Sequence, residues 1–167
     1  VAFDFCFIGT GQGGSRIAET FHKLGYRRTA ALNTAQQDLN TIKDIEHKLC
    51  IGNGGAGKDP AVAKKLYEES SEDVLDFMRY SFGESFDKIF VCAGAGGGTG
   101  AGTLGPLVDG ALELSKTLKS LSDKVGVVLA LPKASEGKRV CANALGTLEK
   151  IWEYVDSGKV SPLILLD

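Results

Sequence analysis

The sequence lacks the features of several protein classes. It has no apolar run close to the roughly 18 residues that a membrane-spanning helix needs. Its formal net charge is only -2, so no overall electrostatic attraction to nucleic acid or anionic lipid is expected. A composition of 43% hydrophobic and 24% charged residues excludes a disordered or collagen-like chain. We therefore expect a globular protein without a membrane or a nucleic acid as its direct partner.

Cysteine and histidine are sparse and lack the spacing of a metal or redox site. The four cysteines lie far apart, and three of them sit in apolar runs where a free thiol packs as a small hydrophobic group. Unpaired cysteines predict a reducing, cytoplasmic location, and Val1 is not followed by a signal-peptide pattern. His22 and His47 have no Ser or Cys partner by motif. We predict no metal ligand and no catalytic side chain in this chain.

Strand-like and helix-like segments alternate along the 167 residues. Strands are predicted at Phe3–Ile8, Arg28–Leu32, Lys48–Ile51, Lys88–Ala93, Val125–Leu131 and Pro162–Leu166. Several of them are apolar at successive positions, which is typical of strands buried on both faces of a parallel sheet. Helices are predicted at Ser15–Leu24, Pro60–Phe82 with a break near Ser70, Ala101–Leu121 and Glu136–Val155. The sequence thus predicts one α/β domain, with a doubly wound and mainly parallel six-stranded sheet.

An apolar stripe at helical spacing marks the last predicted helix. It consists of Leu145, Leu148, Ile151, Trp152 and Val155. Such a stripe is typical of a helix face that packs against a sheet. We therefore predict that Trp152 lies in the core or in an interface.

Glycine is the residue in excess. Of 22 glycines, four lie in Gly9–Gly14, four in Gly52–Gly57 and seven in Gly94–Gly105. Each cluster follows a predicted strand and precedes a predicted helix, so all three should meet at the carboxyl edge of the sheet. Glycine lets the backbone approach a ligand closely, and a helix N-terminus offers unpaired N–H groups to an anion. Three such loops suit a ligand with several phosphates.

Two of the clusters match other nucleotide motifs incompletely. Gly9–Gly14 has the glycine spacing of the dinucleotide fingerprint, but the second predicted strand runs into Asn33-Thr34 without the acid that would bind the ribose. Gly52–Asp59 matches the phosphate loop of ATPases except that Asp59 replaces the magnesium-binding Ser or Thr. Asp59-Pro60 is instead typical of a helix N-cap followed by proline at the first helical position.

The third cluster carries a more specific signature. Gly96–Gly102 reads GGGTGAG, which is the signature of the tubulin and FtsZ family. The chain resembles the Rossmann-like nucleotide-binding domain of FtsZ-like GTPases from its first strand to its last residue. The resemblance implies GTP or GDP with Mg²⁺ as ligands. It also implies nucleotide-switched, head-to-tail assembly through the nucleotide face into a filament that serves cell division, DNA segregation or intracellular positioning.

The resemblance also assigns residues to the site. The implied nucleotide-binding residues are Gly11, Gln12, Gly13, Gly14, Ser15, Asn33, Ala56, Gly57, Lys58, Gly96, Gly97, Gly98, Thr99, Gly100, Glu136 and Arg139. Two positions depart from the bacterial division proteins. Those proteins carry Asp where this chain has Ala35, and their Arg follows the Glu by four residues, whereas Arg139 follows Glu136 by three. One residue turns a helical side chain by about 100°, so Asn143 is an alternative ligand to Arg139, or else an exposed polar residue of the helix. In these departures the chain resembles the TubZ-like proteins of plasmids and phages more closely than the division proteins.

The family resemblance implies a catalytic group outside this chain. Residues 1–167 would form the GTP-binding domain, which ends before the central helix and the C-terminal activation domain. The acidic loop that activates water on the neighbouring subunit would follow Asp167. Two alternatives stay open at this point: an NAD-binding oxidoreductase domain, and a scaffold that binds nucleotide without hydrolysing it.

Overall fold

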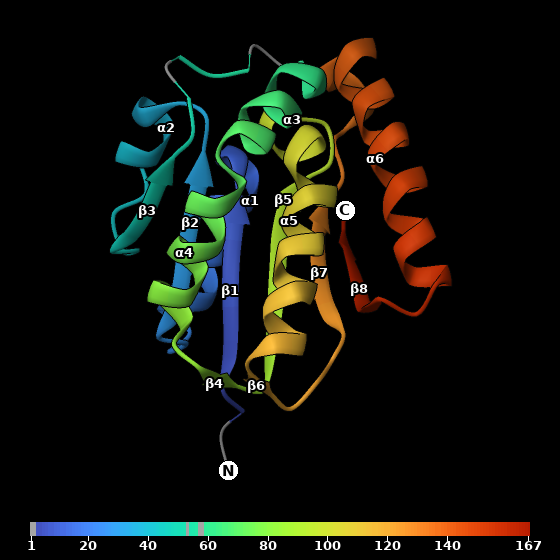
Figure 1. The fold of residues 1–167 in the computed structure, drawn as a ribbon. Coiled ribbons are helices and arrows are strands. Elements are labelled where there is room, and N and C mark those ends of the chain that lie inside the picture. Colours follow the sequence, from blue (N-terminus) through green and yellow to red (C-terminus); the bar gives the residue numbers. More distant parts are fainter. Residues whose placement is uncertain (1–2, 53, 57–58) are drawn as a thin grey trace.

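A six-stranded sheet forms the centre of the computed structural model, which describes residues 3–52, 54–56 and 59–167 (Figure 1). The strands are β1 (Phe5–Thr10), β2 (Arg28–Asn33), β3 (His47–Cys50), β5 (Lys88–Gly94), β7 (Val125–Ala130) and β8 (Val160–Leu166). Their order is β3-β2-β1-β5-β7-β8, and every neighbouring pair is parallel. The predicted fold class and all six predicted strands are therefore confirmed.

Helices cover both faces of this sheet (Figure 1). They are α1 (Gly11–Lys23), α2 (Gln36–Asn40), α3 (Pro60–Glu69), α4 (Ser71–Phe82), α5 (Gly98–Thr117) and α6 (Lys138–Asp156), with the short 3-10 helix η1 at Ala134–Glu136. α3, α4, α5 and α6 pack on one face, and α1 and α2 on the other. The predicted break at Ser70 is confirmed, because Ser70 ends α3 and precedes α4. Among the described residues, no helix is both long and apolar enough to cross a membrane.

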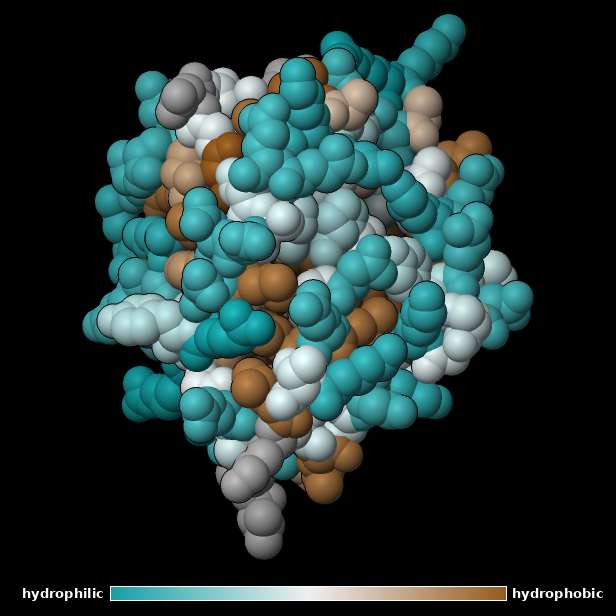
Figure 2. Space-filling model, in the orientation of Figure 1, coloured by the Kyte–Doolittle hydropathy of each residue, from teal (hydrophilic) through white to brown (hydrophobic). Residues whose placement is uncertain are grey.

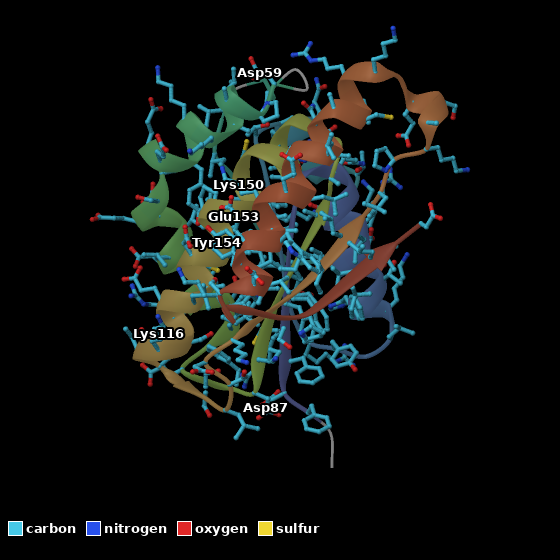
Figure 3. All side chains as sticks on the ribbon, turned by 90° about the vertical axis from the view of Figure 1, so that its right-hand side faces the viewer. Asp59, Asp87, Lys116, Lys150, Glu153 and Tyr154 are labelled. Atoms are coloured by element: carbon cyan, nitrogen blue, oxygen red, sulfur yellow. The ribbon has the colours of Figure 1, made fainter. Side chains whose placement is uncertain are left out.

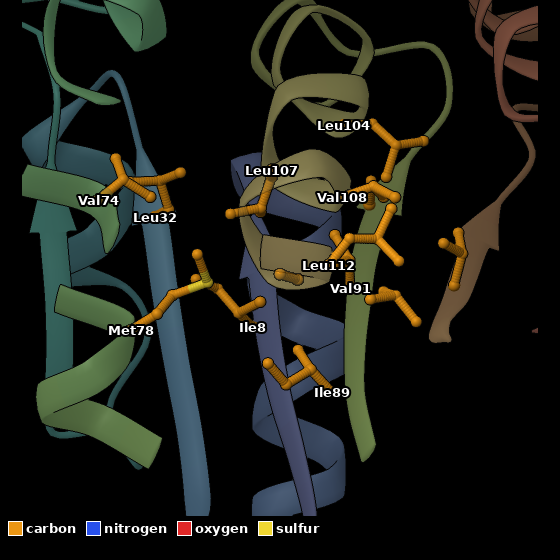
Figure 4. Close-up of a cluster of buried hydrophobic side chains, with 14 of the residues drawn as sticks. Ile8, Leu32, Val74, Met78, Ile89, Val91, Leu104, Leu107, Val108 and Leu112 are labelled. Atoms are coloured by element: carbon orange, nitrogen blue, oxygen red, sulfur yellow. The ribbon is translucent and has the colours of Figure 1, made fainter. Parts of the chain in front are cut away.

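Each face of the sheet has its own hydrophobic core. The larger core joins the strands to α4 and α5 through side chains such as Ile8, Val74 and Met78 (Figure 4). The smaller core lies under α1 and is aromatic: the Phe7 ring centroid is 4.0 Å from that of Phe21 and 5.2 Å from that of Phe90. Polar side chains cover most of the opposite, α4–α5 surface, with apolar groups visible between them (Figure 2). The two cores hold the strands at fixed register, so their carboxyl ends form a common edge.

Several boundaries differ from the predicted ones. α1 begins at Gly11 instead of Ser15, and α5 begins at Gly98 instead of Ala101. The prediction placed these starts too late because glycine has low helix propensity, whereas here the glycines form the first turns. Four short elements were not predicted: helix α2, the 3-10 helix η1, and the strands β4 (Ser85–Phe86) and β6 (Lys119–Ser120), which form a two-stranded parallel sheet. Segments of two to five residues are too short to show a hydrophobic period.

The apolar stripe of α6 is only partly buried. Ile151 is buried and Leu148 packs against the core, but Leu145 is 60% and Trp152 62% exposed. The prediction of a core position for Trp152 is therefore wrong, and an interface position remains a prediction. The reason is that α6 turns one flank toward α5, where Tyr154 donates to the Gly105 carbonyl at 3.3 Å (Figure 3). The side chains of Leu145 and Trp152 are therefore left exposed.

Two buried thiols make the fold sensitive to alkali. Burial raises the pKa of Cys6 from 9.0 to about 12, and it also raises the pKa of Cys92. Both thiols stay neutral in the folded chain but ionise in the unfolded one above pH 9. We expect the free energy of unfolding to fall between about pH 9 and about pH 12, by up to about 1.4 kcal/mol per thiol and pH unit. Urea denaturation at about pH 8 and about pH 10 tests this, and Cys6→Ala should show a smaller decline.

Candidate functional site

A cleft of about 620 Å³ opens at the carboxyl edge of the sheet. Its walls come from five segments: the β1–α1 junction, the end of β2 with α2, residues 54–56, the β5–α5 loop, and the β7–η1 loop with the start of α6. The three glycine clusters thus meet at one edge, as expected for loops that leave neighbouring parallel strands. The cleft is large enough for a ligand of nucleotide size.

Most residues of the predicted site line this cleft. The described lining residues among them are Gly11, Gln12, Gly13, Asn33, Ala56, Gly96, Gly97, Gly98, Thr99, Gly100 and Glu136. Gly57 and Lys58 lie outside the described residues. Four others are not among the described lining residues: Gly14, Ser15, Arg139 and Asn143. Gly14 and Ser15 are buried behind the cleft wall.

Two helices point their N-termini into the cleft. α1 starts at Gly11, whose φ is +74°, and α5 starts at Gly98 after the extended N-cap Gly97. Neither N-cap residue contributes a side-chain hydrogen bond to its helix. The first N–H groups of both helices therefore remain available to a ligand, and the helix dipoles favour an anion there.

Threonine hydroxyls tie the glycine loops together. The hydroxyls of Thr10 and Thr103 hydrogen-bond to each other at 2.6 Å, and those of Thr34 and Thr99 do so at 2.7 Å. Thr103 also donates to the Thr99 carbonyl at 2.6 Å, so Thr10 must be the donor in its pair with Thr103. These bonds fix the start of α5 against the ends of β1 and β2. This network could not be predicted from the sequence, because its partners are up to 93 residues apart.

Helix α6 holds the third glycine loop from behind. The Thr147 hydroxyl lies within hydrogen-bond distance of two carbonyl oxygens, 2.9 Å from that of Ala95 and 2.8 Å from that of Asn143, and Asn143 Nδ2 donates to the Gly96 carbonyl at 3.2 Å. Gly96 lies so close to α6 that a Cβ on it would be 2.8 Å from the Val140 carbonyl oxygen. Asn143 therefore contacts the loop backbone. The sequence shows that Asn143 and Thr147 are one helical turn apart. It does not show which carbonyls these side chains bind.

Removal of the Thr147 hydroxyl should destabilise this loop. Thr147→Val keeps the shape but leaves the buried Ala95 carbonyl without its partner, which costs about 1–3 kcal/mol. Thr117→Val is the matched control, because among the described residues the hydroxyl of exposed Thr117 bonds to the carbonyl of Glu113, four residues earlier in its own helix, and to no distant carbonyl. We expect Thr117→Val to change stability by less than about 0.5 kcal/mol. Equal urea midpoints for the two variants would contradict the contact with Ala95.

Asn33 presents an unpaired donor in the cleft wall. The residue is 2% exposed, and its Oδ1 accepts a hydrogen bond from the Thr34 N–H at 2.8 Å. Its Nδ2 has no partner among the described residues. A buried donor without a partner costs about 1–3 kcal/mol, so this arrangement indicates a ligand with an acceptor oxygen. Ser15 Oγ, behind the cleft, is also buried without a hydrogen-bond partner in the part of the chain that the structure describes.

The family model of the Tubulin/FtsZ family, GTPase domain, matches residues 4–160. The match includes strands β1, β2, β3, β5 and β7 and the complete GGGTGAG loop, and it ends at the first residue of β8. The chain belongs to the Tubulin/FtsZ family. Membership does not favour the NAD-binding oxidoreductase domain that the glycine spacing of Gly9–Gly14 had left open.

Known members of the Tubulin/FtsZ family are similar to this chain in sequence and fold. Cell division protein FtsZ of Aquifex aeolicus is 32% identical over 90% of this chain and 39% of its own length. The solved structure of CetZ from Methanosaeta thermophila is 28% identical with a TM-score of 0.83, covering 99% of this chain and 46% of that chain. TubZ of Clostridium botulinum phage c-st is 25% identical with a TM-score of 0.79, covering 98% and 50%. This chain thus spans half or less of the length of these relatives, which include a TubZ protein as the sequence departures suggested.

The second glycine cluster of this Tubulin/FtsZ domain leads into a capped helix. The Asp59 side chain accepts a hydrogen bond from the Ala61 N–H at 3.0 Å, and Pro60 is the first residue of α3. The predicted N-cap is therefore confirmed. Because its carboxylate caps α3, Asp59 has a structural role that a phosphate-loop Ser or Thr would not have.

Proposed function

We propose that this domain binds GTP and GDP in the cleft, and that the full-length protein is a GTPase that assembles into cytoskeletal filaments. The observation that carries the proposal is the convergence of two helix N-termini and three glycine loops on one cleft. Membership in the Tubulin/FtsZ family supports guanine nucleotide as the ligand. The process that the filament serves could be division, DNA segregation or intracellular positioning.

The proposed contacts divide the nucleotide between the two ends of the cleft. The N–H groups at the starts of α1 and α5 would bind phosphate oxygens, and Asn33 Nδ2 would donate to another acceptor oxygen. Glu136, which lines the cleft at its η1 end, would bind the ribose side. Asn143 and Thr147 would keep the third glycine loop in its binding conformation. Catalysis in this class requires mainly positioning and charge stabilisation, which backbone groups supply.

Mg²⁺ is proposed as the cofactor, and the lining of the cleft fits it. Carboxylate and hydroxyl oxygens are hard donors of the kind that Mg²⁺ prefers, and Asp38, Thr34 and Thr99 all line the cleft. When bound, Mg²⁺ neutralises charge on the phosphates. Among the described residues, no group of three or more His, Cys, Asp or Glu could form a closed protein cage for a metal. An Mg²⁺ ion here would therefore keep phosphate and water ligands.

The remaining proposals concern assembly, extent and location. We propose that full-length copies associate head to tail through the face that carries the cleft, since nucleotide at a subunit contact can switch assembly. The group that activates water would then come from the neighbouring subunit, outside residues 1–167. A cytoplasmic location is proposed because all four cysteines are free thiols.

Ligand-dependent stability tests the nucleotide assignment. A ligand present at 100 times its dissociation constant adds about 2.7 kcal/mol to stability. We expect GTP and GDP to raise the melting temperature of the domain, and ATP and NAD to have little effect. A shift with NAD and none with GTP would favour the oxidoreductase alternative. Binding of GTP by a full-length protein that releases no phosphate at any protein concentration would favour the non-hydrolysing scaffold.

A further inference from the structure

Charged side chains are scarce in the cleft. Among its described lining residues only Asp38 and Glu136 are charged, and both are acidic. A polyphosphate would bring more negative charge next to them, and charges of the same sign repel at short range. The helix N-termini offset only part of this repulsion, because each carries the equivalent of about half a positive charge. Such a cleft favours a polyphosphate that arrives together with a cation.

The two acidic residues differ in what they already bind. Glu136 Oε2 accepts a hydrogen bond from the Lys133 backbone N–H at 2.6 Å, which holds its carboxylate against η1. The carboxylate of half-buried Asp38, on α2, receives no hydrogen bond or ion pair within the described ranges. Its backbone carbonyl is fixed by the Thr41 hydroxyl at 2.7 Å, so the residue is held in place while its carboxylate stays free.

A second observation points to a ligand at the same end of the cleft. Asn33 lies five residues before Asp38, at the end of β2, and its buried Nδ2 has no partner among the described residues. An amide donor selects an acceptor oxygen, whereas a carboxylate selects a cation. A metal–phosphate complex offers both groups together, but a bare phosphate or a bare cation offers only one.

We propose that Asp38 holds the divalent cation of a nucleotide–Mg²⁺ complex, so that this cleft binds the nucleotide tightly only together with the cation. This inference rests on the proposed function. Proteins usually bind Mg²⁺ through one or two carboxylates together with substrate phosphates and water, which matches a single free carboxylate in a phosphate cleft. A structural role for Asp38 is the competing explanation, because an acid in the first turn of α2 also stabilises the helix dipole.

GTP affinity with and without Mg²⁺ distinguishes these roles. Isothermal titration should be done in excess Mg²⁺ and in EDTA, with the unaltered chain, Asp38→Asn and the control Asp156→Asn. Asp156 is the exposed last residue of α6 and gives the same change in charge away from the cleft. We expect the unaltered chain and Asp156→Asn to bind GTP at least about tenfold more tightly in Mg²⁺ than in EDTA.

Asp38→Asn should change this pattern in a specific way. In Mg²⁺ it should bind GTP about tenfold more weakly than the unaltered chain, and in EDTA equally or more tightly, because the repulsion is gone. Asp38→Glu keeps a carboxylate and should recover most of the Mg²⁺ dependence. The melting temperature without nucleotide checks that each variant is folded.

Three results would overturn the inference. The first is a Mg²⁺ dependence in Asp38→Asn equal to that of the unaltered chain, and the second is Mg²⁺-independent GTP binding by the unaltered chain. Both leave the proposed function standing. The third is the absence of GTP binding by the unaltered chain under either condition, which would overturn the proposed function and this inference with it.

Discussion

Gly97→Val should weaken GTP binding about 100-fold while leaving the domain folded. Gly97 is the N-cap of α5 and lines the cleft, and a Cβ on it would meet no atom within 4 Å. The protein itself therefore has room for a side chain at this position, at a cost of about 1 kcal/mol for a less favourable N-cap. The proposed phosphate does not have that room, because the side chain would stand in front of the first N–H groups of α5.

The expected loss of affinity follows from the contacts that would be blocked. Loss of two hydrogen bonds to a charged group, each contributing about 1.5 kcal/mol or more, lowers affinity by about 3 kcal/mol. This corresponds to a rise of about 100-fold in the dissociation constant. Titration calorimetry with GTP measures the affinity, and the melting temperature without nucleotide confirms folding.

Gly146→Val provides the matched control for this substitution. Gly146 is exposed on α6, a Cβ there also meets no atom within 4 Å, and the residue is not among the described residues that line the cleft. We expect Gly146→Val to bind GTP like the unaltered chain. Equal GTP affinities for Gly97→Val and Gly146→Val would contradict the placement of phosphate at the start of α5.

The strands were predictable because a strand that is buried on both faces of the sheet has apolar residues at successive positions. β5 and β7 have such runs, and the structure places both inside the sheet, with a neighbouring strand on each side. The Asp59 N-cap was also predictable, since its interaction spans only two residues. The meeting of the glycine clusters at one edge followed from parallel topology alone. Local signals and general topology thus located the cleft.

The support of the cleft could not be predicted, because it depends on contacts between distant segments. Thr147 binds a carbonyl 52 residues away, and the pairing of Thr34 with Thr99 spans 65 residues. Asp38 showed no signal as a cleft residue, because α2 is too short to show which side faces the cleft. The exposure of Trp152 could not be predicted either. Helical spacing shows that a helix has an apolar face, but it does not show whether another element covers that face.

Gly14→Ala should destabilise the domain severely, whereas Gly13→Ala should not. Both residues lie in the first turns of α1, and neither has a positive φ. A Cβ on Gly14 would overlap the Cys92 carbonyl oxygen and lie 2.9 Å from the Cα of Ala93, so α1 could not pack on β5 at its present distance. A Cβ on Gly13 would lie 3.5 Å from the Cα of Gly94, which is an ordinary contact.

The two variants should therefore change the free energy of unfolding in opposite directions. Gly13→Ala should be neutral or stabilising by up to about 1 kcal/mol, because alanine has the higher helix propensity. Gly14→Ala should cost about 4 kcal/mol or more, since the clash is with strand backbone that cannot rotate away. That is a large part of the roughly 5–15 kcal/mol by which a domain is stable, so reduced expression and a much lower urea midpoint are expected. Urea denaturation followed by circular dichroism, without nucleotide, measures both changes independently of GTP binding. A cost below about 1 kcal/mol for Gly14→Ala would mean that α1 and β5 are not in backbone contact, and the shape of the cleft at Gly11–Gly13 would have to be revised.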